Sequence, residues 1–204
     1  MIYNILNESL KRIWPSLVIV NVIVLVLRIC YQISKKEKIY FYKEFFLILS
    51  VTYLLLLYEL VTRVDYNTLG GGVNIIPFQE ISRYSISSEL FLMNVIGNIV
   101  LFIPFGFIIN TYFKTKKVWT TLISALIVST TIEFVQKQIG RSFDIDDILL
   151  NTIGCIIGFL IYKLYSKIPE NFKKTWIYNL ICVLILVIIV LLYFYWGNVW
   201  INLG

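Results

Sequence analysis

Residues 118–165 read VWTTLISALIVSTTIEFVQKQIGRSFDIDDILLNTIGCIIGFLIYKLY, which is two apolar runs joined by a short polar segment. Each run, over 118–138 and 147–165, is close to the ~20 residues that an α-helix needs to cross the hydrocarbon core of a membrane. Neither run alternates polar and apolar residues, as a transmembrane β-strand does. The stretch therefore predicts two membrane-spanning helices that are connected at one membrane surface.

Similar apolar runs lie on both sides of this stretch. They cover residues 13–33, 44–62, 91–110 and 176–196. Of the 204 residues, 59% are hydrophobic and 15% are charged, and the mean hydropathy is +0.82. So few polar residues cannot cover so much apolar surface in water. We therefore predict an all-α, polytopic integral membrane bundle of about six transmembrane helices in the plasma membrane, surrounded by membrane lipids.

The chain divides into three parts on this prediction. Residues 1–43 form an N-terminal interfacial segment and the first transmembrane helix. Residues 44–165 form a core that contains the polar residues discussed below. Residues 166–204 form a C-terminal transmembrane helix and a short tail.

Lys and Arg are distributed unevenly between the predicted loops. The first, third and fifth loops carry most of them, and the residues after the last helix carry none. The positive-inside rule places these basic loops in the cytoplasm. Both termini, and the loops over 63–90 and 140–147, are then extracytoplasmic. The net charge of +6 reflects this topology, so nucleic-acid binding is not predicted.

Polar side chains within the apolar runs occur on three consecutive predicted helices. A charged side chain at the bilayer centre costs roughly 2.5–3.5 kcal/mol on insertion scales, so such positions are informative. Spacings of three or four residues place the two members of each pair on one helix face. The pairs are Asn94 and Asn98, Glu133 and Gln136, and Asp147 and Asn151. All six residues lie toward the predicted extracytoplasmic ends of their helices, which indicates a shared polar cleft.

The loop over 140–147 adds Arg141, Asp144 and Asp146 beside Asp147. We therefore predict an extracytoplasmic ligand-binding cleft. Its predicted residues are Asn94, Asn98, Glu133, Gln136, Arg141, Asp144, Asp147 and Asn151.

The loop over 63–90 contains a glycine run, 70–72, followed by Asn74-Ile-Ile-Pro77-Phe78. Apolar residues exposed in water would be unusual in a loop, so we expect this segment to dip back and cover the cleft as a lid or a re-entrant turn. Asn74, Pro77 and Phe78 are the predicted lid residues.

Each polar group also has a purely structural interpretation. The three aspartates can cap the helix that follows them. Glu133 can pair with Lys137 one turn later, and the amide side chains can join helices by hydrogen bonds. The Gly154-x-x-x-Gly158 spacing favours close helix packing.

Composition also limits the chemistry. The chain has no histidine, which excludes His-based catalytic triads and most catalytic zinc sites. The cysteines, Cys30, Cys155 and Cys182, all lie within apolar runs and are predicted to be free. No cofactor is predicted, except that Asp144, Asp146 and Asp147 are weak candidates for Mg²⁺ if the protein is an enzyme.

The ordered set of these motifs resembles the VanZ-like family. The resemblance covers about residues 44–165. It includes Asn74-x-x-Pro77-Phe78, Asn94-x-x-x-Asn98 followed by Pro104 and Gly106, Glu133-x-x-Gln136, Arg141, Asp144, and Asp147-x-x-x-Asn151-x-x-Gly154-x-x-x-Gly158. It implies a bacterial cell-envelope membrane protein associated with lowered susceptibility to teicoplanin and related lipoglycopeptides. It implies no particular reaction.

Three functions are compatible with these features. The first is non-enzymatic binding or remodelling of an amphiphile at the outer leaflet, either a lipid-linked cell-wall precursor or a lipoglycopeptide. Arg141 and the amides would then hold a phosphate or sugar, and residues 102–107 would contact the acyl part. The second is a hydrolase or transferase acting on a lipid-linked phosphate, with Glu133 or Asp147 as general base. The third is a small-solute transporter, which the concentration of polar groups at one membrane surface disfavours. The sequence does not predict an oligomeric state.

Overall fold

The computed structural model describes residues 2–63, 72–115, 117–174, 177, 178 and 180. Within these residues, five helices are long and apolar enough to cross a membrane. They are Asn7–Lys35, Phe41–Thr62, Glu89–Phe113, Val118–Gln138 and Ile145–Tyr165. This confirms the predicted all-α, multi-pass membrane architecture. The sixth predicted helix, over 176–196, lies almost wholly outside the described residues.

The chain forms two compact units, Met1–Leu56 with Ile168–Gly204, and Leu57–Lys167. The first unit contains α1 (Ile2–Lys35) and the greater part of α2 (Phe41–Thr62). From the later part of the chain it contains the short helix α7 (Glu170–Lys173). The buried Glu44 carboxylate accepts a hydrogen bond from Gln32 Nε2 at 2.7 Å and lies 3.5 Å from Arg28 Nε. A buried carboxylate needs such partners, so these residues join α1 to α2.

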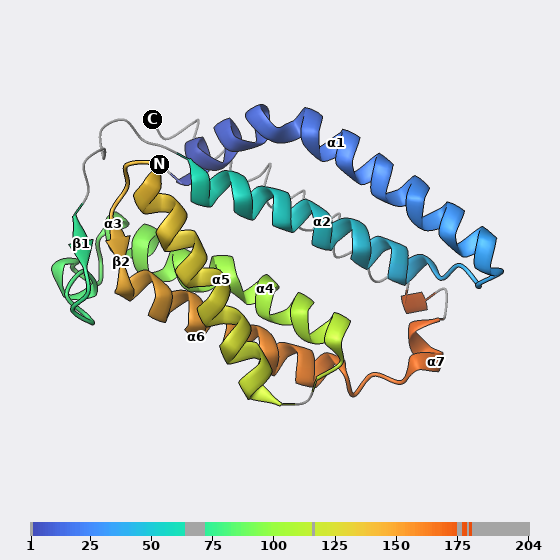
Figure 1. Ribbon diagram of the computed structural model, residues 1–204. Helices are drawn as coiled ribbons and strands as arrows, with labels where there is room; N and C mark the ends of the chain where they lie inside the picture. Colours follow the sequence, from blue (N-terminus) through green and yellow to red (C-terminus); the bar gives the residue numbers. More distant parts are fainter. Residues whose placement is uncertain (1, 64–71, 116, 175–176, 179, 181–204) are drawn as a thin grey trace. The chain divides into compact units, whose positions relative to one another are not determined.

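The second unit is a bundle of three long helices. The first is continuous over α3 (Glu89–Phe91), a π-helical turn (Leu92–Ile96) and α4 (Gly97–Phe113). The others are α5 (Val118–Gln138) and α6 (Ile145–Tyr165). Figure 1 shows α4, α5 and α6 running alongside one another, and α6 packs on both of the others.

Glycines bring the backbones of α4 and α6 into contact. A Cβ atom on Gly106 would lie 2.7 Å from Cys155 Cα, and one on Gly158 would lie 2.7 Å from Phe107 N. Such distances leave no room for a side chain, so the Gly154-x-x-x-Gly158 pattern is a packing motif, as its spacing predicts.

The buried face of α5 is made of small and polar residues. Thr121, Ala125, Ser129 and Glu133 follow one another at intervals of four, and each is at most 1% exposed. Thr121 exchanges hydrogen bonds with the amide of Asn110 on α4, at 2.8 and 3.0 Å. The pairing of Asn110 with Thr121 was not predicted from the sequence. These polar side chains therefore join α5 to its neighbours by hydrogen bonds.

A two-stranded parallel sheet closes one end of the second unit (Figure 1). In it β1 (Val73–Asn74) pairs with β2 (Phe143–Asp144), with Asn74 opposite Asp144. The sheet brings the loops over 63–90 and 140–147 together, so both lie on the same side of the membrane, as the predicted topology requires.

Candidate functional site

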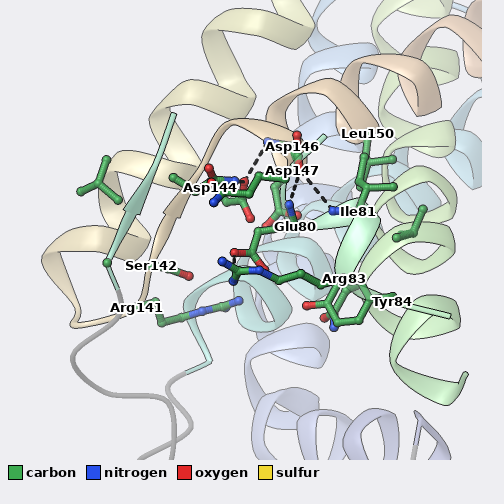
Figure 2. A pocket seen from close by; sticks show the side chains of 16 residues that line it. Glu80, Ile81, Arg83, Tyr84, Arg141, Ser142, Asp144, Asp146, Asp147 and Leu150 are labelled. Atoms are coloured by element: carbon green, nitrogen blue, oxygen red, sulfur yellow. Dashed lines mark hydrogen bonds and ion pairs between the residues drawn. The ribbon is translucent and has the colours of Figure 1, made fainter. Parts of the chain in front are cut away.

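A cavity of about 530 Å³ lies in the second unit, beside the two-stranded sheet. Its walls come from the loop after β1, from the start of the long α3–α4 helix and from the start of α6 (Figure 2). The polar residues that line it are Asn74, Gln79, Glu80, Arg83, Tyr84, Asn94, Arg141, Ser142, Asp144, Asp146 and Asp147. A hollow with so many hydrogen-bonding groups is suited to a polar ligand.

Asp146 fixes the loop wall of the cavity. Its carboxylate accepts backbone hydrogen bonds from Phe78 at 2.5 Å, Glu80 at 2.9 Å and Ile81 at 3.2 Å. The side chain is 1% exposed. Because both of its oxygens are engaged by these N–H groups, Asp146 has a structural role.

Asp144 connects three parts of the site. It is the N-cap of α6, accepts the Asp146 N–H at 2.9 Å, and accepts Asn74 Nδ2 at 2.8 Å. Its own N–H donates to Glu133 Oε2 at 2.9 Å. Burial raises the pKa of the Asp144 carboxyl above its ordinary value, and the charges of Asp146 and Glu80 act in the same direction, while the two hydrogen bonds oppose them.

Asp147 and Arg141 also line the cavity. Asp147 Oδ1 accepts a hydrogen bond from Asn98 Nδ2 of α4 at 2.5 Å. Arg141 Nη1 donates to the backbone carbonyl of Val61 at 3.3 Å, and Gln136 Nε2 donates to the same carbonyl at 3.0 Å. Val61 lies in the last turn of α2, where carbonyls lack helical partners. Gln136 and Arg141 therefore both donate to the backbone at the end of α2. Gln136 does not line the cavity.

Glu133 and Asn151 lie beneath the cavity and do not line it. Glu133 is 1% exposed and binds the Asp144 N–H. Asn151 is 3% exposed and donates to Ser129 Oγ at 2.8 Å, while its Oδ1 has no hydrogen-bond partner among the described residues. Of the eight predicted cleft residues, Asn94, Arg141, Asp144 and Asp147 thus line the cavity, and Asn98, Glu133, Gln136 and Asn151 do not.

The loop after β1 contributes residues that the sequence did not single out. Arg83 forms an ion pair with Glu80, and both line the cavity. Burial raises the pKa of the neighbouring Tyr84 hydroxyl, the charges of Glu80, Asp147 and Asp144 raise it further, and a hydrogen bond with Asn94 opposes them. One sequence feature could have predicted that these residues line the cavity. It is the polar cluster over 79–84, which directly follows the apolar residues of the predicted lid.

Only one of the predicted lid residues lines the cavity. Asn74 does so, whereas Pro77 and Phe78 do not, and Phe78 is 66% exposed. The expectation that residues 102–107 contact an acyl chain is wrong for two of them. Phe102 and Phe105 are 1% and 9% exposed and belong to the core.

The three aspartates do not form a metal centre. Among the described residues, no group of three or more His, Cys, Asp or Glu side chains is placed to hold a metal ion. The carboxylate of Asp146 accepts hydrogen bonds from the backbone N–H groups of Phe78 and Glu80, which accounts for its burial without a metal ion. The placement of these side chains therefore gives no support to the Mg²⁺ site that the enzyme alternative would need.

Comparison with known proteins gives a consistent picture. No solved structure matches the chain. The chain is 27% identical over 150 residues to Protein VanZ of Enterococcus faecium, a match that covers 70% of this chain and 88% of that protein. The VanZ/LLP1 family model matches residues 44–166, which include the whole site described above. The chain therefore belongs to the VanZ/LLP1 family and is a multi-pass membrane protein of VanZ type.

Proposed function

We propose that the cavity binds the polar head of an amphiphilic molecule of the bacterial cell envelope at the outer leaflet, and that this lowers susceptibility to teicoplanin and related lipoglycopeptides. The observation that supports this most is the position of a polar cavity of about 530 Å³ at the end of a membrane-spanning bundle. Its volume is within the roughly 300–1,000 Å³ of typical small-molecule sites. An amphiphile held there would keep its acyl part in the bilayer.

The residues of the cavity favour a sugar or a phosphorylated sugar as the bound head. Arg83 and Arg141 reach it from two different segments (Figure 2). Arg83 Nη1 is paired with Glu80 and Arg141 Nη1 with the Val61 carbonyl, so the remaining N–H groups of both side chains are those that can donate to a phosphate. Asp147, Asn94 and Tyr84 offer acceptors and donors for hydroxyl and amide groups. A lipid-linked cell-wall precursor and a lipoglycopeptide both carry sugars on a lipid, and so share this chemistry.

Binding accounts for the arrangement better than catalysis does. Glu133, one of the two candidate general bases, binds the backbone N–H of Asp144 and does not line the cavity. Asp147 does line it, but its Oδ1 is engaged by Asn98. A hydrolase would also need an activated nucleophile or a metal-bound water. Ser142 lines the cavity, but among the described residues no hydrogen bond joins its hydroxyl to either candidate base, and no group of three acidic side chains is placed to hold a metal ion.

The proposal is tested with Arg141→Ala and a matched control, Lys167→Ala, which removes an exposed basic residue after the other end of α6. Cells with equal amounts of each variant are incubated with fluorescent teicoplanin. The purified proteins are titrated separately with a lipid-linked cell-wall precursor. We expect the wild type to bind the precursor in the titration or to alter the binding of teicoplanin to cells, or both. Lys167→Ala should behave like the wild type, and Arg141→Ala should lose whichever of these two activities the wild type shows. The proposal is wrong if cells with the wild-type protein bind teicoplanin as cells without it do, and if the purified wild type binds neither molecule.

A further inference from the structure

Four consecutive apolar residues, Ile75-Ile76-Pro77-Phe78, form the tip of the loop after β1. All four are exposed to their surroundings within the described part of the chain, with Ile75 at 68%, Ile76 at 59% and Phe78 at 66%. None of them lines the cavity. A run of this kind at a water-exposed surface is costly and marks a contact with an apolar phase or partner.

The tip is held in a fixed conformation. The Ile76 N–H donates to Asn74 Oδ1 at 3.1 Å, and the Phe78 N–H donates to Asp146 Oδ1 at 2.5 Å. Phe78 adopts a positive φ of 67°, which is unfavourable for an aromatic residue. Since the bond to Asp146 maintains this conformation, the exposure of the Phe78 side chain is a feature of the fold.

The same hydrogen bonds place the tip at the membrane boundary. Asp146 is the second residue of the spanning helix α6, so the Phe78 backbone lies at the level where that helix begins. The next spanning segment starts at Glu89, shortly after the loop. Between Phe78 and Glu89, the side chain of Ile86 is 80% exposed. The apolar tip therefore lies at the level where the spanning helix α6 begins.

We infer that residues 75–78 insert into the lipid leaflet that borders the cavity, at the boundary between the headgroups and the acyl chains. Bulky apolar side chains on a fixed turn are the usual anchors at that depth. In the same loop the polar side chains of Gln79, Glu80, Arg83 and Tyr84 line the cavity. The loop then forms a wall with lipid against its tip and the polar cavity against its second half. This inference does not depend on which ligand the cavity binds.

A single fluorophore reports where the tip lies. Cys30, Cys155 and Cys182 are replaced by Ala in the full chain, and a cysteine is introduced by Phe78→Cys or, separately, by Ile76→Cys. Ser82→Cys supplies a control in the same loop, because Ser82 is an exposed polar residue. Each protein is labelled with an NBD group and reconstituted in phosphatidylcholine vesicles. Quenching by aqueous iodide is compared with quenching by phosphatidylcholine that carries a nitroxide near the headgroup end of its acyl chain.

We expect the labels at 76 and 78 to emit at shorter wavelength than the label at 82. They should be quenched strongly by nitroxide lipid and several-fold less by iodide. Labels at 76 and 78 that are reached by iodide and not by nitroxide lipid would show a tip in water. Labels shielded from both quenchers would show a tip covered by protein, and energy transfer between differently labelled copies would identify a second copy. Either result overturns the inference, and agreement between the two labelled sites guards against a locally misfolded variant.

Discussion

The carboxylate of Asp146 accepts the backbone N–H of Phe78 at 2.5 Å, across a separation of 68 residues in the chain. With two further bonds from Glu80 and Ile81, this side chain joins the first turn of a spanning helix to the loop that walls the cavity. The shape of the cavity therefore depends on a residue that need not touch the ligand.

Asp146→Asn should loosen this loop. The substitution leaves one oxygen to accept hydrogen bonds and turns an NH₂ group toward backbone donors. Hydrogen bonds to a charged acceptor contribute about 1.5–3 kcal/mol each, so amide exchange at Phe78, Glu80 and Ile81 should accelerate by roughly tenfold or more. Hydrogen exchange read by mass spectrometry over residues 76–84 measures this. Asp147→Asn is the matched control, because Asp147 binds Asn98 and no described backbone group of the loop. Equal exchange in both variants would mean that Asp146 does not hold the loop.

Asp144 should make stability depend on pH in an unusual direction. Its carboxyl pKa is raised in the folded protein by burial, so the folded state binds more protons than the unfolded state over the range between the two pKa values. Stability then falls as the pH rises from the ordinary carboxyl range through the raised pKa, and the loss is complete above it. Asp144→Asn keeps a good N-cap residue and cannot ionise. Denaturant unfolding of both proteins in detergent should show the wild type losing stability relative to the variant as the pH rises. Parallel curves would contradict the prediction.

Gly158→Ala should destabilise the helix bundle. The added Cβ would lie 2.7 Å from Phe107 N and 3.0 Å from Gly106 C, both of which are backbone atoms of α4 that cannot move aside independently. Overpacking of this kind typically costs about 1–3 kcal/mol. Thermal unfolding in detergent measures the change. Gly72→Ala is the control, since a Cβ there has no atom within 4 Å; a similar loss in both variants would point to a general effect of replacing glycine.

The fold was largely predictable because spanning helices are specified by local composition. Runs over 91–110, 118–138 and 147–165 correspond closely to observed helices, since a membrane requires continuous apolar segments of nearly fixed length. That the loops over 63–90 and 140–147 share one side of the membrane also followed, because a chain that crosses the membrane twice returns to the same side, but their pairing as two strands did not.

The details of the site were less predictable because they depend on contacts between distant segments. Helical spacing placed Asn94 and Asn98 on one face, but Asn94 lies within a π-helical turn over Leu92–Ile96, which changes the register. Asn94 therefore lines the cavity, while Asn98 binds Asp147. Arg83 and Tyr84 were overlooked because nothing within their own loop shows that it faces α6. Such a relationship becomes visible only once the backbone of Phe78 is placed against Asp146.

Tyr84 gives a test of the cavity that leaves its charges in place. Tyr84 and Asn94 both line the cavity, and the Asn94 side chain acts to lower the pKa of the Tyr84 hydroxyl. Tyr84→Phe removes one neutral hydrogen-bonding group, which contributes about 1 kcal/mol, so affinity for the amphiphile that the wild type binds should fall by roughly fivefold. Arg141→Ala should cost more, because a hydrogen bond to a charged partner is stronger. Titration of the purified proteins measures both values, with Tyr58→Phe as a control at an exposed tyrosine of α2. If Tyr84→Phe keeps its affinity and Arg141→Ala loses it, the bound head lies at the Arg141 side of the cavity. If both variants keep their affinity, the head lies outside the cavity altogether.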